Sequence, residues 1–189
     1  EHSGSVREVG DAGKYPGPVC AADLDGDGRD ELVVLREQTT PSSAVVLEAF
    51  ESWGTSVPGF GAPTIPGRGL GGHDAEAMRP NLVLADATGD GRTEVALLTK
   101  RTGSDLAQLL LFDATGSEIL TPADLELPGP GDVYVSAGGL DAVVDIDGGL
   151  TDEFVVRRMR SVGASGWASE LLVFEQDWSA GSIVLRQTI

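Results

Sequence analysis

Residues 23–35 read DLDGDGRDELVVL, in which three aspartates alternate with leucine and glycine ahead of an apolar run. Glycine allows the backbone angles that a tight turn needs, and such a turn directs the side chains of Asp23, Asp25 and Asp27 to one point. Three carboxylates held this close repel one another strongly unless a cation lies between them. The stretch therefore predicts a metal-binding loop that leads into a β-strand.

The same pattern returns twice along the chain. It reads DATGDGRTEVALL at 86–98 and DIDGGLTDEFVVR at 145–157, so the copies begin 63 and then 59 residues apart. A second apolar run follows each copy, and these runs contain Phe50, Phe112 and Phe174, each 62 residues from the last. Two separate signals with nearly the same period indicate an internal duplication.

Each duplicated unit has the pattern of short β-strands. Its apolar runs are short and bounded by Gly, Pro, Ser and Asp, and no segment has a convincing helical period. Fourth strands are expected at 117–120 and 182–187, and none is clear in the first unit. Four strands in about 60 residues describe a propeller blade. We therefore predict an all-β, β-propeller-like fold of about three four-stranded blades.

The predicted division of the chain follows these units. Residues 1–15 are an N-terminal tail or a blade-completing strand, 16–80 are blade 1 with a long loop, 81–139 are blade 2 with a loop, and 140–189 are blade 3. Propellers need about four to eight blades to close. We therefore expect a homo-oligomer or a larger assembly to complete the ring.

The composition excludes several classes of partner. Thirty acidic residues against 13 basic ones give a formal net charge of −17, which repels nucleic acid and anionic lipid. No run approaches the roughly 18 apolar residues of a membrane span, so no membrane insertion is expected. Cys20 is the only cysteine and lies between apolar residues, so it is predicted to be a small core residue and no intrachain disulfide is possible.

The ligand chemistry favours calcium. Ca²⁺ accepts six to eight oxygen ligands in a flexible geometry, whereas Mg²⁺ demands a stricter octahedron and retains more water. The loops contain no cluster of His or Cys, which zinc prefers. An EF-hand is the competing interpretation, but it requires a bidentate Glu at loop position 12 and a helix after it. Position 12 is Val34, Leu97 or Val156 in the three copies, and each lies in a strand-like run.

The pattern D-x-D-x-D-G-x-x-[DE], followed by an apolar strand, resembles the FG-GAP repeat and the related VCBS repeat of integrin-α-like propellers. The resemblance spans all three units and is strongest in the first two. A Phe60-Gly61-Ala62-Pro63 string also occurs. The resemblance implies a calcium-binding β-propeller in an extracellular or cell-surface protein, with side-chain ligands at positions 1, 3, 5 and 9 and a backbone carbonyl at position 7.

The resemblance assigns a ligand set to each loop. The first loop would use Asp23, Asp25, Asp27, the carbonyl of Arg29, and Glu31. The second would use Asp86, Thr88, Asp90, the carbonyl of Arg92, and Glu94. The third would use Asp145, Asp147, the carbonyl of Thr151, and Glu153, with Gly149 leaving position 5 without a ligand.

These sets predict different affinities. The ligand charge is −4 in the first loop and −3 in each of the others, and affinity rises with the charge count and the rigidity of the site. We expect the first loop to bind most tightly and the third most weakly. The predicted count is two Ca²⁺ ions, or three if the third loop also binds one.

No catalytic motif is found. His73 lies in a Gly-rich loop beside Asp74, which is typical of an exposed residue. Trp53 and Trp178 follow the Phe-bearing runs at nearly equivalent positions, so they are either blade-packing residues or a sugar-stacking surface.

The sequence therefore predicts a non-catalytic, extracellular, calcium-stabilised binding or adhesion module with a carbohydrate or protein ligand. The alternatives are a structural subunit of a secreted or cell-surface assembly and, third, a propeller hydrolase or lyase.

Overall fold

A computed structural model describes residues 19–38, 44–66, 81–100, 107–121, 123–125, 137–149, 151–161 and 166–189. Within these ranges the chain forms β-strands and no helix, which confirms the all-β prediction. The strands belong to three four-stranded sheets. The first sheet comprises β1 (Val19–Ala22), β2 (Glu31–Gln38), β3 (Ala44–Phe50) and β4 (Thr64–Pro66). The second comprises β5 (Asn81–Ala85), β6 (Glu94–Lys100), β7 (Ala107–Phe112) and β8 (Ala123–Leu125). The third comprises β9 (Ala137–Val144), β10 (Glu153–Ser161), β11 (Trp167–Asp177) and β12 (Ser182–Thr188).

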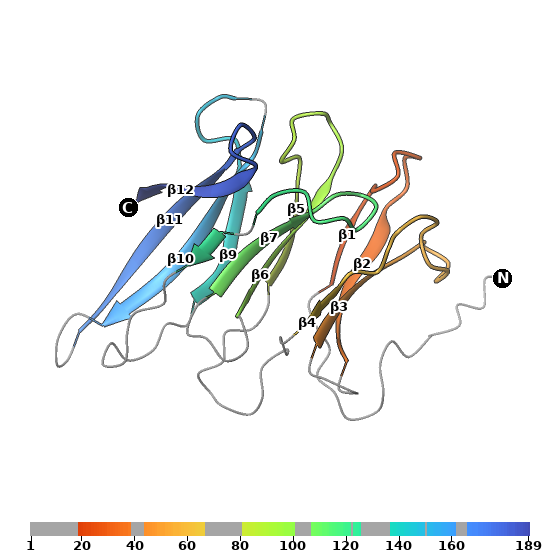
Figure 1. The fold of residues 1–189 in the computed structure, drawn as a ribbon, viewed down its shortest axis with the longest axis horizontal. Helices are drawn as coiled ribbons and strands as arrows, with labels where there is room; N and C mark the ends of the chain where they lie inside the picture. Colours follow the sequence, from red (N-terminus) through yellow and green to blue (C-terminus); the bar gives the residue numbers. More distant parts are fainter. Residues whose placement is uncertain are drawn as a thin grey trace.

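Each sheet is an antiparallel meander in which strands adjacent in sequence are hydrogen-bonded neighbours. The three sheets lie in a row in chain order, with the second sheet between the other two (Figure 1). The first strands of the sheets, β1, β5 and β9, are in contact with one another along the row. None of the three sheets closes on itself.

The central position of the second sheet explains its unbroken apolar sequence. In β6, Val95 and Leu97 face the first sheet, whereas Ala96 and Leu98 face the third. Both faces are covered, so successive residues along the strand are apolar rather than alternating. The outer sheets each contribute one face to a shared core.

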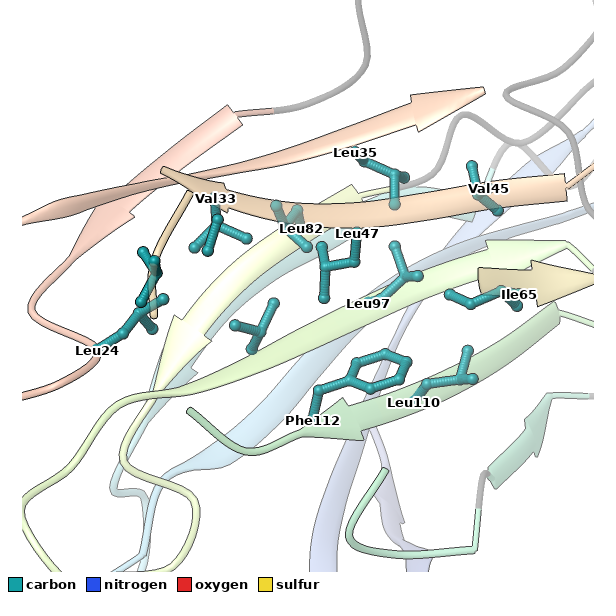
Figure 2. Close-up of a cluster of buried hydrophobic side chains, with 13 residues drawn as sticks. Leu24, Val33, Leu35, Val45, Leu47, Ile65, Leu82, Leu97, Leu110 and Phe112 are labelled. Atoms are coloured by element: carbon teal, nitrogen blue, oxygen red, sulfur yellow. The ribbon is translucent and has the colours of Figure 1, made fainter. Parts of the chain in front are cut away.

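Two hydrophobic cores fill the spaces between the sheets. The core between the first and second sheets is drawn in Figure 2, where Leu24, Val33, Leu47, Leu97 and Phe112 lie between the two layers of strands. The core between the second and third sheets includes the equivalent Phe174. Burial of these side chains supplies the main driving force for stacking the sheets.

The Phe60–Pro63 string connects the first two sheets. The Gly61 N–H donates to the Thr115 carbonyl at 2.7 Å, and the Pro63 carbonyl accepts from the Leu47 N–H at 3.0 Å. Ala62 has a φ of 45°, a left-handed conformation that non-glycine residues adopt rarely. The string therefore lies against the turn of the neighbouring sheet.

The prediction of the fourth strands is correct in one unit and wrong in another. The strand expected at 182–187 is β12. No strand forms at 117–120, where the chain makes only an isolated antiparallel bridge between Phe112 and Glu118. A turn precedes it, in which Asp113 Oδ1 accepts from the Thr115 and Ser117 N–H groups, at 2.8 and 2.9 Å. The fourth strand of that sheet is β8, a few residues later. The first sheet also has a fourth strand, β4, which the sequence did not define.

The EF-hand interpretation is excluded, because Val34, Leu97 and Val156 lie in β2, β6 and β10 rather than in helices. Cys20 is half-buried against the first core, and burial raises the pKa of its thiol to about 12, which makes it an unreactive thiol. Among the described residues, no helix is long and apolar enough to cross a membrane. The N-terminal tail at 1–15, His73 and Asp74 lie outside the described residues.

Candidate metal centres

The three acidic loops occupy equivalent places in the fold. Each connects the first and second strands of its sheet, namely β1 to β2, β5 to β6, and β9 to β10. All three lie along the same edge of the row of sheets, at the top of Figure 1. The duplication seen in the sequence therefore places three similar loops side by side.

The first aspartate of each loop organises the turn. Asp23 Oδ1 accepts from the Gly26 N–H at 2.7 Å, and its Oδ2 accepts from the Gly28 N–H at 2.9 Å. Gly26 and Gly28 have φ values of 81° and 85°, which only glycine adopts without a steric penalty. The glycines therefore let the loop wrap its amides around the aspartate.

The other two loops repeat this arrangement. Asp86 accepts from the N–H groups of Gly89, Asp90 and Gly91, at 2.8, 3.1 and 2.9 Å. Asp145 accepts from Gly148 and Gly149 N–H groups, at 2.6 and 2.9 Å. In all three loops the first aspartate therefore accepts from the N–H three residues further on, and from one or two further N–H groups that differ between the loops.

The glutamate at position 9 closes each loop from the strand that follows it. Glu31 Oε2 accepts from the Leu24 N–H at 2.8 Å, Glu94 Oε2 from the Ala87 N–H at 2.8 Å, and Glu153 Oε2 from the Ile146 N–H at 2.7 Å. All three glutamate side chains are buried, whereas the loop aspartates are largely exposed. Each loop therefore has one buried carboxylate, held by a backbone N–H, and further carboxylates that are accessible to solvent.

The first loop has an unsatisfied acceptor. Glu31 is fully buried, and its Oε1 has no hydrogen-bond partner among the described residues. Carboxylate oxygens of Asp23, Asp25 and Asp27 lie within 4.8 Å of one another in the same loop. Burying a carboxylate oxygen without a partner is costly, and a cation in the loop would remove that cost. The residues of this loop therefore fit a metal ion.

The third loop also gathers its acids, although Gly149 leaves position 5 without a side chain. Carboxylate oxygens of Asp145, Asp147 and Glu153 lie within 4.8 Å of one another. The Gly149 N–H donates to Asp147 Oδ1 at 2.9 Å, so the loop remains closed around its two aspartates. These two acidic clusters, in the first and third loops, could each hold a metal ion.

The second loop is arranged differently. Among the described residues, its acids Asp86, Asp90 and Glu94 do not form a cluster of this kind. Thr88 takes the place of an acid, and its Oγ1 lies 3.4 Å from Glu94 Oε1. Burial raises the pKa of the Glu94 carboxyl, an effect that the N–H groups of Ala87 and Thr88 oppose. The prediction of a ligand set in this loop, and of the Arg29, Arg92 and Thr151 carbonyls as ligands, stays a prediction.

Two acids that the sequence analysis did not select lie close to the loops. The pKa of the Glu51 carboxyl is raised, first by desolvation and then by the negative charges of Glu31, Asp25 and Asp27. Asp152 binds the backbone of the second loop from the third, with its Oδ2 3.0 Å from the Asp86 nitrogen. Both residues occupy repeated positions, since Glu51 follows Phe50 as Asp113 follows Phe112, and Asp152 is position 8 of its loop, but the sequence does not show what they contact.

The two tryptophans are on the surface. The side chains of Trp53 and Trp178 are 59% and 45% exposed, so neither is a buried blade-packing residue. The Arg29 guanidinium carbon lies 5.8 Å from the centroid of the Trp53 ring, within the range of a cation–π contact. Trp53 therefore lies beside the first loop.

No protein-family model matches the chain, and no curated protein matches it. Two solved structures share its fold. Rhamnogalacturonan lyase YesW matches with a TM-score of 0.56 and 19% identity, over 92% of this chain and 34% of its own. A Bacillus licheniformis rhamnogalacturonan lyase matches with a TM-score of 0.60 and 20% identity, over the same shares of the two chains. The chain thus spans about a third of the length of these neighbours.

These neighbours contradict the prediction of a non-catalytic binding or adhesion module, because both are lyases. Sequence reasoning ranked an enzyme last because the chain contains no catalytic motif of a known type. Whether this chain is itself an enzyme stays a prediction, because a shared fold does not determine function. At 19–20% identity, the likeness shows a shared fold.

Proposed function

We propose that the acidic loops bind Ca²⁺ and that the bound ions stabilise the sheets. The single observation that supports this most is in the first loop, where Asp23, Asp25 and Asp27 cluster and the Oε1 of the buried Glu31, which closes the same loop, has no hydrogen-bond partner. Hard oxygen donors in a flexible loop suit calcium better than magnesium or zinc. Three Ca²⁺ ions would add a charge of +6 and so change the formal net charge from −17 to −11.

Thermal unfolding with calcium, with magnesium and with a chelator tests this proposal. Because the ion binds the folded loop, calcium should raise the melting temperature, and magnesium should raise it less. Native mass spectrometry then gives the number of ions on each chain. Equal melting temperatures with calcium and with chelator would contradict the proposal.

We also propose that the three sheets are blades of a β-propeller that further sheets complete, from a second copy or a larger assembly. Phe112 and Phe174 are buried in cores that face the preceding sheet, whereas their counterpart Phe50 is only partly buried. Val19 and Leu32, on the same face as Phe50, are 57% and 44% exposed. Beside the Arg36–Glu48 ion pair on the same face, these exposed apolar side chains are typical of an unfilled contact with a polar rim. A chain that stays monomeric at every concentration would argue against a second copy.

The activity that we propose for the protein is lyase cleavage of an acidic polysaccharide of the rhamnogalacturonan class. The support is the fold that it shares with two lyases of that specificity. Fold alone does not determine function, so an assay must decide. A lyase leaves a carbon–carbon double bond in its product, which absorbs ultraviolet light. We propose that the protein is extracellular, because the proposed ion and the proposed polysaccharide substrate are both found outside the cell.

Incubation of the chain with rhamnogalacturonan, with calcium and with chelator, provides that assay. We expect unsaturated product with calcium and much less with chelator, since the loops would lose their order. Matched incubation with a neutral polysaccharide controls for nonspecific absorbance. If the calcium-loaded chain produced no unsaturated product, lyase activity in this chain would be refuted, and the metal proposal would stand on the unfolding data.

A further inference from the structure

The second and third acidic loops are joined by a reciprocal pair of hydrogen bonds. The Asp86 N–H donates to Asp152 Oδ2 at 3.0 Å, and the Asp152 N–H donates to the Asp86 carbonyl at 3.1 Å. These two residues belong to different sheets and are separated by 66 positions in the sequence. The pair therefore ties the backbone of one loop to the side chain and backbone of the other.

Both residues hold key places in their loops. Asp86 is the first residue of the second loop, and its carboxylate accepts three backbone N–H groups there. Asp152 directly precedes Glu153, whose carboxylate belongs to the acidic cluster of the third loop. The Asp152 carbonyl is fixed in turn by Gln176 Nε2, at 2.9 Å. Asp152 is therefore bonded to the first residue of the second loop and adjoins the acidic cluster of the third.

We propose that Asp152 is a positioning residue that couples metal binding in the second loop to metal binding in the third. An ion in the third loop holds Glu153, and so the adjoining Asp152, in one conformation. Asp152 then holds the backbone of Asp86 in the conformation that the second loop needs. Two sites that order a shared element bind with positive cooperativity. This inference rests on the proposal that the loops bind calcium.

The first loop lacks this connection. The residue of the second loop that corresponds to Asp152 is Thr93, and among the described residues it makes no such bond to Asp23. Threonine is also too short and lacks the carboxylate that Asp152 uses. Asp30, at the corresponding position of the first loop, is exposed. The first loop should therefore bind calcium independently of the other two.

A thermodynamic cycle measured by calorimetry with calcium chloride tests the coupling. The first loop is disabled by Asp23→Asn with Asp25→Asn, and the calcium affinity of the second loop is then measured with the third loop intact or disabled by Asp145→Asn with Asp147→Asn. We expect disabling the third loop to weaken the second roughly 5-fold or more, the lower end of typical coupling between sites.

Variants of Asp152 locate the connection. Asp152→Ala keeps the backbone bond to the Asp86 carbonyl and removes the side-chain bond, so disabling the third loop should affect the second much less. Asp152→Asn should preserve the coupling because its amide oxygen still accepts from Asp86. Asp30→Ala, made with the first loop intact, is the matched control and should leave the coupling unchanged. If Asp152→Ala fails to fold, Asp152→Asn gives the test, since loss of coupling in this folded variant would mean that the hydrogen bond to Asp86 is not the connection.

The outcomes distinguish the coupling between the loops from the proposal that the loops bind calcium. If the second loop binds calcium equally well with the third loop intact or disabled, the coupling is overturned and metal binding still stands. If Asp152→Ala keeps the full coupling, the Asp152 side chain is not the connection. If no calcium binds to the unmodified chain, both the coupling and the metal proposal are overturned.

Discussion

Glu31 and Leu24 fasten the first acidic loop to the hydrophobic core. The Leu24 N–H donates to Glu31 Oε2 at 2.8 Å, while the Leu24 side chain is buried in the core between the first and second sheets. The second oxygen of the same carboxylate, Oε1, is buried without a hydrogen-bond partner among the described residues. The core therefore fixes the position of an acceptor that an ion in the loop could use.

Glu31→Gln tests the role of this carboxylate. The amide keeps the size of the side chain and an oxygen to accept from Leu24, but it removes the charge that an ion would bind. We expect the variant to lose most of the calcium-dependent rise in melting temperature that the first loop provides, with little change in chelator. Asp30→Asn, an exposed neighbour, should behave like the unmodified chain. A full calcium response in Glu31→Gln would exclude Glu31 as a ligand.

Removal of calcium should lower the stability of the whole chain. A ligand at about 100 times its Kd stabilises the folded state by about 2.7 kcal/mol for each site. For a domain of this size, 1 kcal/mol shifts the melting temperature by about 2–4 °C. Each filled loop should therefore add about 5–10 °C, measured by thermal unfolding with excess calcium and then with chelator. A total shift below that of one site would mean that the loops are solvated turns.

The sequence predicted the fold well where local pattern determines it. The acidic loops are found between strands, and the central strands begin where the apolar runs begin, because glycine turns and apolar runs are local signals. The strand expected at 117–120 was misplaced, since the Asp113 side chain accepts a hydrogen bond from the Ser117 N–H and so favours a turn over a strand pairing.

The candidate sites were only partly predictable for a different reason. Glu51 reaches the first loop through the pairing of β3 with β2, whereas Asp152 reaches the second loop from the neighbouring sheet. A single sequence contains no signal for such long-range contacts. Counting ligands also does not distinguish the second and third loops, which carry equal ligand charge, although the acids of the third gather despite Gly149. The conformation of the loop, rather than the number of acids, brings its oxygens together.

Calcium binding to the second loop should depend on pH through Glu94. Burial raises the pKa of its carboxyl above the ordinary value of 4.5. In the metal-free chain, this residue therefore contributes stability below pH 4.5, and the contribution is lost as the pH rises through the raised pKa. Calcium requires the ionised carboxylate, so its affinity should rise over that same interval and binding should release protons.

Calorimetry in buffers of different ionisation enthalpy measures the number of protons released. We expect a release below neutral pH that is reduced in Glu94→Gln. Glu48→Gln, which alters a carboxylate paired with Arg36 outside the loops, is the control and should leave the release unchanged. The same proton release in all three proteins would mean that Glu94 is not the group that titrates.

The fluorescence of Trp53 should change when the first loop binds calcium. Arg29, whose guanidinium lies against the Trp53 ring, also supplies the backbone carbonyl predicted to bind the ion. Binding that reorients Arg29 should change the environment of the indole and therefore its fluorescence. We expect a calcium-dependent change in emission that disappears in Trp53→Phe and persists in Trp178→Phe. A signal that survives Trp53→Phe would have to arise away from this contact.

The contact between the first two sheets is tested most directly at Gly116. A Cβ on Gly116 would lie 2.9 Å from Pro63 Cδ and 3.3 Å from Phe60 Cζ, and the residue has a φ of +78°. Gly116→Ala therefore adds overpacking, typically about 1–3 kcal/mol, to the cost of a left-handed backbone, about 1–2 kcal/mol. Gly59→Ala is the matched control, since Gly59 has a φ of +85° and nothing within 4 Å of the added Cβ. Urea unfolding midpoints should fall further in Gly116→Ala than in Gly59→Ala. Equal midpoints would mean that the Phe60–Pro63 string moves aside freely and does not hold the sheets together.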